Sequence, residues 1–500
     1  MSGAGQVTQI LGAPEVTVGQ ARVAAIIAWL PLAAGLAAVA AGAWMLGGTF
    51  HGDPTIYLVY ARNAAEGHLF EFNPGTFSSG VASPLWTLVL AVPFVVGAGI
   101  TGAKIWTAVW ALTALASTTL AVRRLTGSTL AATIGAAVAV PGLAYYGVMT
   151  YDSGLTVTLV ALSLIARGPA LAGIWALMFF DRPELAIVIG LEALALGWRR
   201  FVPLAALAAL PAGVYYAYSH VTLGSYSVSN VTRTIDNTEL ATRVGPLLVS
   251  GPALDYLLGM APLAAIAALG LWSNRRHALV VGGVLAAFAA VLVLYPVTLY
   301  VQRYALAAMP LLALGVGLAI ARFRLLAIAV GALVATPALA WLVAASLAGQ
   351  HGFMFDVVTE RTVVERLNTL APPQATVLGY EVQDRWYLRS DLDYLAVNGL
   401  TDGLITPWRE RGDVTGYLKT YCPAIWIAND QDFGVAYYRG TILETAYREL
   451  MTGRMQIELE GITFTVVDRP APPLSGFAGA RMLVRLDSQA CTGTSAAITR

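Results

Sequence analysis

A polar loop directly after the first long apolar segment carries most of the side chains that could do chemistry. It spans residues 48–83 and places Asp53 a few residues after that segment ends, near the expected membrane surface. A carboxylate in water is a weak base, but partial burial raises the pKa of such a group toward the range that general-base catalysis needs. A reaction on a lipid-linked substrate would need its base at this height, which makes Asp53 the candidate catalytic residue. The simpler alternative is that Asp53 caps a helix beginning at Pro54.

Other polar residues of this loop could bind a substrate, and its turn tracts could shape the floor of a sugar site. The same tracts could also be turns of the loop with a purely structural role. Two histidines beside two carboxylates raise the possibility of a divalent cation, but their spacing fits no standard ligand motif, so no metal or other cofactor is predicted. The candidate substrate-binding residues of the loop are Arg62, Asn63, Glu66, His68, Asn73, Ser83 and Trp86.

Composition places this loop in a membrane protein. The 500 residues are 57% hydrophobic and only 12% charged, with a mean hydropathy of +0.67. Soluble enzymes carry about 25% charged residues, so an ordinary soluble enzyme is excluded. The net charge of +1 gives no field that would indicate a nucleic-acid partner.

Apolar blocks of roughly 18–25 residues are long enough to cross a bilayer core as helices. The first block is too long for the apolar region of a signal peptide, so we expect it to be retained as a transmembrane helix. We predict an α-helical multi-pass protein of the plasma membrane with about 11 transmembrane helices. They fall at residues 23–47, 104–121, 128–145, 154–166, 168–180, 185–197, 201–219, 252–272, 278–300, 304–321 and 325–349. Three of them, 154–166, 168–180 and 185–197, are shorter than the rest, which is typical of tilted, broken or partly spanning helices.

The positive-inside rule orients these helices. The basic pairs all fall on the cytoplasmic side if residues 84–96 form a re-entrant or interfacial helix rather than a crossing. The loop 48–83, the loops 146–153 and 181–184, and everything after residue 349 then share the outer side. The pairs are Arg123/Arg124, Arg199/Arg200, Arg275/Arg276 and Arg322/Arg324.

The last 150 residues differ in composition and predict a second, extracytoplasmic domain over 350–500, after a transmembrane domain over 1–349. Apolar spacing predicts a helix from Phe353 to Leu370, and β-branched runs predict strands at 376–378, 425–428 and 457–467. A soluble α/β domain is therefore expected. Cys422 and Cys491 could pair in an oxidising compartment, and two free thiols are the alternative. The aromatic residues of this domain suit sugar stacking, but an ordinary core is favoured; they are Trp386, Tyr387, Tyr394 and Trp408.

Several different short motifs follow one another along the chain. They are Asp53-Pro-Thr-Ile, Tyr60-Ala-Arg-Asn, Gly67-His68, Phe72-Asn-Pro-Gly and Ser83-Pro-Leu-Trp-Thr, followed by Ser153-Gly-Leu, Arg182-Pro-Glu, Arg303-Tyr304 and Gly399-Leu-Thr-Asp. In this order they resemble the GT-C superfamily of polyprenyl-phosphate-sugar glycosyltransferases, and most closely the terminal arabinofuranosyltransferases of actinobacterial cell-wall assembly. The resemblance implies a GT-C fold, a decaprenyl-phosphate sugar donor, and a cell-wall polysaccharide acceptor outside the membrane.

The resemblance also implies roles. Asp53 would remove the proton from an acceptor hydroxyl as that oxygen attacks the anomeric carbon and the lipid phosphate leaves. The leaving phosphate is anionic and is stabilised by a cation, for which Arg303 is the first candidate. Alternatively, Arg303 extends to lipid headgroups within an interfacial belt. The candidate substrate-binding residues beyond the first loop are Asp152, Arg182, Glu184, Arg233, Arg303 and Tyr304.

The chain departs from the family pattern at three positions. Gly52 replaces the first residue of an acidic pair, Thr156 stands where a glutamate usually follows Ser-Gly-Leu, and Val81 replaces an aromatic residue. Three alternatives therefore stay open: the same transferase architecture using another lipid-linked sugar such as mannose, a transporter for lipid-linked glycans, and a glycan-binding scaffold without activity. Glu192 is the clear carboxylate within a predicted span, whereas a transporter would need several such ionisable residues.

Overall fold

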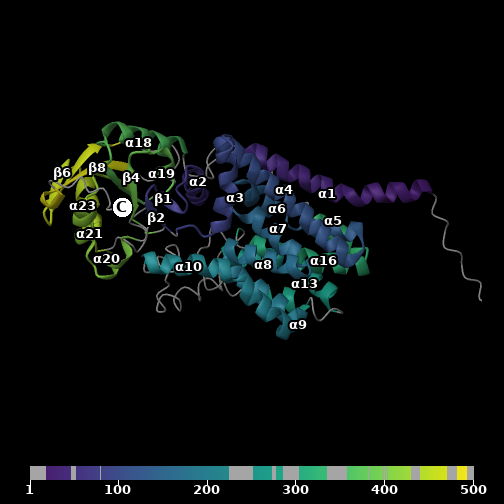
Figure 1. Ribbon diagram of the computed structural model, residues 1–500. Coiled ribbons are helices and arrows are strands. Elements are labelled where there is room, and N and C mark those ends of the chain that lie inside the picture. The colour runs from purple at the N-terminus through teal and green to yellow at the C-terminus, as the bar shows by residue number, and fades with distance from the viewer. Residues whose placement is uncertain are drawn as a thin grey trace, which may run out of the picture.

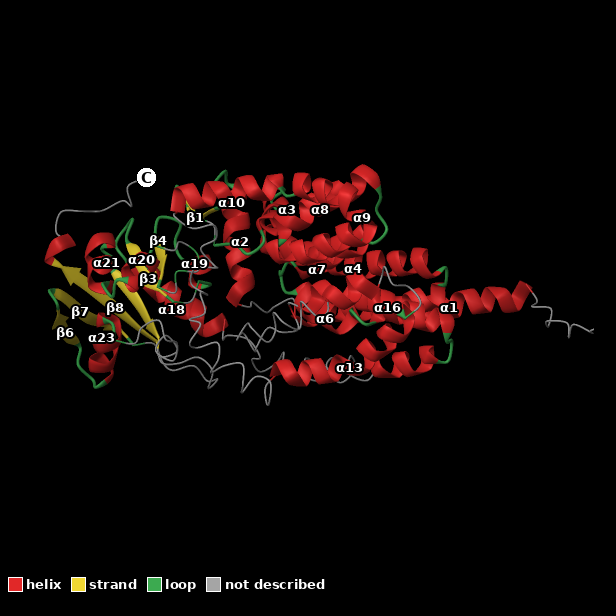
Figure 2. Cartoon of the chain, turned by 90° about the horizontal axis from the view of Figure 1, so that it is seen from below, coloured by secondary structure: helices red, strands yellow, loops and turns green. Residues whose placement is uncertain are grey.

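The computed structural model has a helical body at one end and a mixed α/β domain at the other (Figure 1). A short helix and a small hairpin lie between them, and the view from below shows the same arrangement (Figure 2). The structure describes residues 18–46, 52–78, 80–223, 252–272, 278–284, 303, 305–334, 357–380, 382–397, 399, 401, 404–429, 440–469 and 481–491.

The helical body contains the apolar segments of the sequence. Its α-helices are α1 (Val18–Leu46), α3 (Pro84–Val95), α4 (Gly99–Thr126), α5 (Thr129–Ala137), α6 (Val140–Tyr145), α7 (Ser153–Ser163), α8 (Gly168–Asp181), α9 (Ala186–Ala208), α10 (Leu210–Leu223), α13 (Pro252–Leu271) and α16 (Met309–Arg322). Short 3-10 turns lie at η1 (Tyr146–Val148), η2 (Pro183–Leu185) and η4 (Leu306–Ala308).

Local sequence explains where several of these helices begin and end. Gly127 adopts a left-handed conformation, with φ of 70°, and ends α4. The next residue, Ser128, caps α5 by accepting a hydrogen bond from the backbone N–H of Ala131. Ser83 caps α3 in the same way, and Pro84 occupies the first helical position, where its missing N–H costs nothing.

Among the described residues, two helices are long and apolar enough to cross a membrane, and two further pairs qualify if each bent pair is one span. The prediction of about 11 crossings is therefore met only in part, and residues 285–302 and 335–349 lie outside the description. The predicted span 128–145 is divided between α5 and α6, which meet at 57°. The predicted break between 197 and 201 is instead a kink at Gly197, whose φ is 122°, inside α9. The segment 84–96 forms a 12-residue helix, and whether it crosses stays untested.

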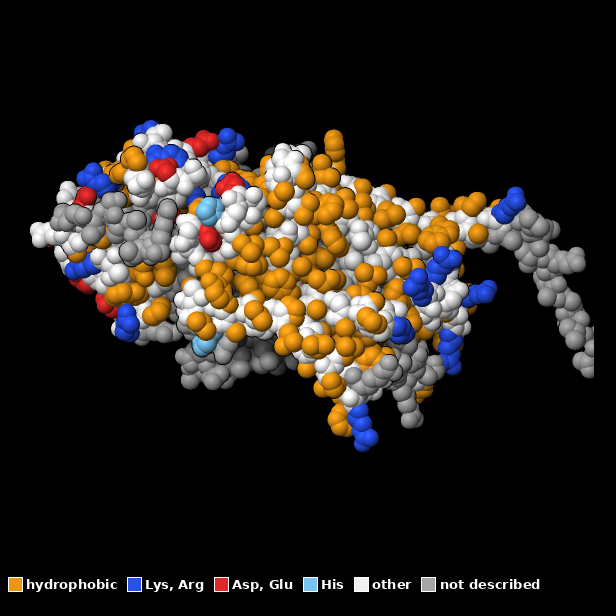
Figure 3. Space-filling view, in the orientation of Figure 1, with side chains coloured by type: hydrophobic (Ala, Val, Ile, Leu, Met, Phe, Trp, Pro, Cys, Tyr) orange, Lys and Arg blue, Asp and Glu red, His pale blue; other side chains and the backbone are white. Residues whose placement is uncertain are grey.

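The surface agrees with a membrane-embedded body (Figure 3). Hydrophobic side chains cover the middle of the visible face, over the helical body, whereas charged side chains of both signs gather on the α/β domain. Lys and Arg side chains also gather at the far end of the body, opposite that domain. This is the distribution that the positive-inside rule predicted for the cytoplasmic end.

The first loop forms α2 (Gly52–Ala65) and a hairpin of β1 (Glu71–Asn73) and β2 (Thr76–Phe77). The turn between the strands holds Gly75 at a φ of 88°, a conformation that favours glycine. The α2 helix is buried along much of its length, with Tyr57, Leu58, Val59 and Tyr60 each no more than 2% exposed. The loop is thus a packed connection between body and domain.

The C-terminal domain holds a six-stranded sheet in the order β4-β3-β5-β8-β7-β6. The first three strands are parallel, and the remaining pairs are antiparallel. Side chains alternate between two cores: Val377 faces the one that includes α18, and Leu378 faces the one that includes α21 and α23. The elements are β3 (Thr376–Gly379), β4 (Asp393–Ala396), β5 (Ile425–Asn429), β6 (Gln456–Leu459), β7 (Ile462–Asp468), β8 (Arg481–Ser488), α18 (Val357–Leu370), α19 (Asp384–Tyr387), α20 (Thr406–Glu410), α21 (Val414–Tyr421), α23 (Ile442–Met451) and η5 (Gln489–Cys491).

These elements agree with the expected α/β class, with one correction. The run 457–467 is not a single strand, because Glu460 and Gly461 both have positive φ and turn the chain between β6 and β7. Cys422 and Cys491 form a disulfide, which settles the alternative that the sequence left open. Of the four aromatic residues, Tyr394 is fully buried, as the core interpretation requires, whereas Trp386, Tyr387 and Trp408 are half-buried.

Candidate active site

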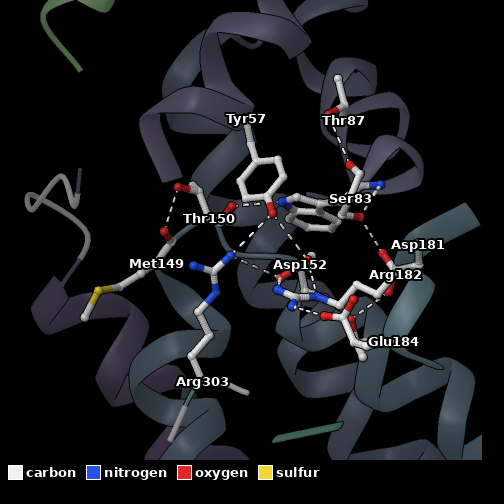
Figure 4. Close-up of polar contacts among 12 residues, drawn as sticks. Tyr57, Ser83, Thr87, Met149, Thr150, Asp152, Asp181, Arg182, Glu184 and Arg303 are labelled. Carbon is white, nitrogen blue, oxygen red and sulfur yellow. Dashed lines mark hydrogen bonds and ion pairs between the residues drawn. The ribbon is translucent and has the colours of Figure 1, made fainter. Parts of the chain in front are cut away.

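Four polar side chains from distant parts of the chain meet at the base of α2 (Figure 4). Asp152, at the start of α7, accepts hydrogen bonds from Arg182 Nε at 2.6 Å and Arg182 Nη2 at 2.7 Å. Arg303 Nη2 lies 4.0 Å from Asp152 Oδ1 and 3.3 Å from the Tyr57 hydroxyl. Tyr57 donates to Asp152 Oδ2 at 3.4 Å. We refer to Tyr57, Asp152, Arg182 and Arg303 as the polar network.

The polar network is buried, which makes its charges energetically demanding. Asp152 is fully buried, and Arg182 and Arg303 are 5% and 6% exposed. Burial alone would raise the pKa of Asp152, but the positive charges of Arg182 and Arg303 and the hydrogen bonds from Arg182 outweigh it and hold that pKa below its ordinary value. Asp152 is therefore an ionised carboxylate that orients cations, and it is poorly suited to accept a proton.

The two arginines differ in how they are held. Arg182 is bound by Asp152 on one side and donates to Glu184 at 2.8 Å on the other. Arg303 lies further from Asp152, and its guanidinium carbon sits 4.0 Å from the centre of the Tyr151 ring. An interfacial arginine reaching for headgroups would be exposed, so the burial of Arg303 argues against that alternative. Of the two arginines, Arg182 makes the shorter contacts with Asp152.

A second buried carboxylate lies beside the polar network. Asp181, at the end of α8, accepts hydrogen bonds from Ser83 at 2.5 Å and from Thr156 at 2.6 Å. Thr156 is one of the positions at which the chain departs from the resembled family, and its hydroxyl here binds a carboxylate from the neighbouring helix. Ser83 thus has two roles, since it caps α3 and fixes Asp181.

Three of the predicted substrate-binding residues of the first loop donate hydrogen bonds to backbone carbonyls. Asn63 donates to the carbonyls of Glu71 at 2.9 Å and Phe72 at 3.0 Å, which ties β1 to α2. Asn73 donates to the Tyr394 carbonyl at 2.8 Å and accepts from the Tyr394 N–H at 2.9 Å, which ties β1 to β4. The buried indole of Trp86 donates to the Thr150 carbonyl at 2.9 Å.

The remaining loop candidates lie away from the polar network. Arg62 stacks on Trp386 with its guanidinium carbon 4.7 Å from the ring centre, at the contact between α2 and α19. His68 pairs with Glu71 at 2.9 Å, and Glu66 is exposed. In the described residues no group of three or more His, Cys, Asp or Glu side chains could hold a metal ion.

Asp53 lies in the first turn of α2, one helical turn before Tyr57, and its side chain is outside the description. Positions four apart share one face of a helix, so position 53 is on the face that carries Tyr57 to the polar network. The predicted candidates Arg233 and Tyr304 also lie outside the described residues.

Tyr57 and Asp181 belong to the site but were not among the predicted residues. Tyr57 sits inside the loop motif, four residues after Asp53, and this spacing was the available signal. Asp181 directly precedes the Arg182-Pro-Glu motif, but only the packing of α8 against α3 and α7 reveals its partners.

No protein-family model matches the chain, and no curated protein matches it at a significant level of sequence similarity. Among solved structures, the fold is similar to that of ArnT from Cupriavidus metallidurans, which was crystallised with undecaprenyl phosphate bound. The TM-score is 0.56 at 15% sequence identity, and the match covers 94% of this chain and 98% of the other. The similarity extends over the helical body and the C-terminal domain together, and the chain therefore shares the fold of that protein.

Proposed function

We propose that the protein is a membrane glycosyltransferase that moves a sugar from a polyprenyl-phosphate donor to a glycan on the outer side of the membrane. The observation that carries the proposal is the buried polar network, in which two guanidinium groups converge where the loop helix meets the apolar helices. Guanidinium groups suit phosphate oxygens, and the fold resembles that of a protein crystallised with a polyprenyl phosphate.

In the proposed reaction Arg303 binds the phosphate of the lipid carrier, and Asp152 and Tyr57 keep its guanidinium in place. The phosphate leaves as an anion, so a fixed cation stabilises the departing group without the reorganisation that water would need. Asp53, one turn from Tyr57 on α2, removes the proton from the acceptor hydroxyl. The bond from the anomeric carbon to the phosphate oxygen breaks as the bond to the acceptor oxygen forms.

The finer identity of the substrates rests on the motifs of the first loop. Their resemblance to terminal arabinofuranosyltransferases leads us to propose decaprenyl-phosphoryl-arabinofuranose as donor and a cell-wall polysaccharide as acceptor. The Cys422–Cys491 disulfide supports an outer location for the C-terminal domain, because such bonds persist in oxidising compartments. The basic end of the body, opposite that domain, supports the same orientation.

A transporter is less well supported. Glu192 is buried in α9 and accepts hydrogen bonds from Ser163 at 2.7 Å and from the Trp175 indole at 2.7 Å. A carboxylate fixed by two neighbouring helices serves packing between them, rather than a pathway for ions or substrates.

The test is transfer by purified protein in nanodiscs, with polyprenyl-phosphoryl-arabinose as donor and a short arabinan as acceptor. Asp53→Asn should lose at least about a hundredfold in turnover, as expected for loss of a general base, while Glu458→Gln, at an exposed position of β6, serves as a control. Polyprenyl-phosphoryl-mannose is run in parallel. Transfer of mannose alone would replace the arabinosyl assignment, and equal turnover by wild type and Asp53→Asn would remove Asp53 as base.

A further inference from the structure

A second cationic site lies where the C-terminal domain meets the loop helix, apart from the polar network. Arg385, on α19, is 1% exposed. Its Nε and Nη1 atoms are buried and make no hydrogen bond within the described part of the chain. Buried guanidinium groups in proteins are normally hydrogen-bonded to an anion or a carbonyl, since an uncompensated buried charge is strongly unfavourable.

A second arginine stands beside it. Arg62, from α2, stacks on the ring of Trp386, the residue after Arg385, and Arg62 Nη1 lies 3.4 Å from the Trp386 carbonyl. Burial first, and then the positive charge of Arg62, lower the pKa of Arg385 to about 10. An arginine with a pKa in that range is still protonated at neutral pH, so two positive charges sit close together at this contact.

The carboxylates nearby do not complete the site. Asp393 and Glu66 attract Arg385 electrostatically, but neither accepts a hydrogen bond from its Nε or Nη1 atom. Asp384, the preceding residue on α19, pairs with Arg481 at 3.3 Å. Unused donor atoms therefore remain on Arg385 while its local charge stays only partly balanced.

We infer that Arg385 and Arg62 form a binding site for a phosphate group, at the contact between the C-terminal domain and α2. A carboxylate has two oxygens, which a single guanidinium fork occupies, whereas a phosphate has enough oxygens for two forks from separate elements. The site is distinct from Arg303 and Arg182, so it goes beyond the proposed transfer reaction. Its phosphate comes either from a polyprenyl phosphate or from a water-soluble phosphate, such as one carried by an acceptor.

The experiment measures the thermal unfolding of the full-length protein in nanodiscs as inorganic phosphate is added. Wild-type protein should show a saturable rise in Tm. Arg385→Met should weaken phosphate binding about tenfold to a hundredfold, as expected for the loss of charge-assisted hydrogen bonds. Arg485→Met, which removes an exposed arginine of the same domain that pairs with Asp487, should leave phosphate binding unchanged.

The phosphate-free state separates an anion site from a packing role. Without phosphate, Arg385→Met should be at least as stable as wild type, because it removes a buried charge that lacks a hydrogen-bonded partner. If both Arg385→Met and Arg385→Lys unfold at clearly lower temperature than wild type without phosphate, the side chain serves packing and the inference fails. It fails equally if wild type shows no response to phosphate, or if Arg385→Met responds as wild type does.

A competition experiment identifies the source of the phosphate. Excess polyprenyl phosphate in the nanodisc should abolish the response to inorganic phosphate if the lipid carrier occupies this site. A response that persists assigns the site to a water-soluble phosphate. Neither result depends on turnover, so failure of the transfer reaction and failure of this site can be told apart.

Discussion

Neutralising Asp152 tests whether the polar network is a coupled unit. The change Asp152→Asn keeps the shape of the side chain but removes the charge that accepts two hydrogen bonds from Arg182 at 2.6 and 2.7 Å. Because Asp152 is fully buried, solvent cannot replace it, and Arg182 and Arg303 lose the carboxylate between them. Breaking a buried ion pair by removing one partner costs about 3–5 kcal/mol.

That free energy translates into a measurable shift in Tm. An unfolding entropy of about 2.1 cal/mol/K per residue gives roughly 1 kcal/mol/K for a chain of this length, so Tm should fall by roughly 3–5 °C. The assay is thermal unfolding in nanodiscs, followed by tryptophan fluorescence. Asp391→Asn is the matched control, because it removes a surface carboxylate that also pairs with an arginine, and such pairs contribute little.

A double-mutant cycle isolates the contact between Asp152 and Arg182. If the pair is coupled as the geometry indicates, Asp152→Asn combined with Arg182→Gln should cost clearly less than the sum of the single changes. Strictly additive effects, or a loss of Tm no greater than that of Asp391→Asn, would refute the reasoning that this buried pair organises the site.

Three further changes probe the site and its supports. Arg303→Gln should lower turnover of a polyprenyl-phosphate donor by about 10²–10³-fold, the cost of removing one fixed electrostatic group, and an unchanged rate in the transfer assay would exclude its role at the phosphate. Asn73→Ala removes the two hydrogen bonds that join the hairpin to Tyr394, so limited proteolysis should cleave the hairpin faster; an unchanged cleavage rate would mean that the contact is dispensable. Replacing Cys422 and Cys491 by serine should destabilise the C-terminal domain by about 4 kcal/mol, because the bond closes a long loop. Alkylation of whole cells without reductant should find both native thiols protected, and ready labelling would contradict an oxidising location.

The sequence predicted those parts of the fold that depend on local pattern. Apolar spacing located α4, α7, α8 and α18 to within a few residues. A helix that is buried on one face or all round needs apolar residues at matching positions, and this pattern is visible in the sequence. The hairpin of β6 and β7 was missed, since its turn uses Glu460 as well as Gly461 at positive φ, and glutamate is not a usual turn signal.

The site was predictable only where its residues lie within motifs. Asp152, Arg182 and Arg303 were found by resemblance, and the structure brings them together although they are separated by up to 151 positions in the chain. Asn63 and Asn73 were predicted as substrate-binding residues, and their hydrogen bonds to backbone carbonyls could not be predicted from the sequence. Such contacts depend on tertiary packing, and no alternation or spacing of residues in the sequence indicates them.

The two asparagines of the first loop have a mechanical consequence. Asn63 forms hydrogen bonds that connect β1 to α2, and Asn73 forms hydrogen bonds that connect the same strand to β4. The six-stranded sheet is therefore linked to α2 through β1. A displacement of the sheet would then also displace α2, the helix that carries Tyr57. A force applied to the C-terminal domain would therefore also act on the polar network.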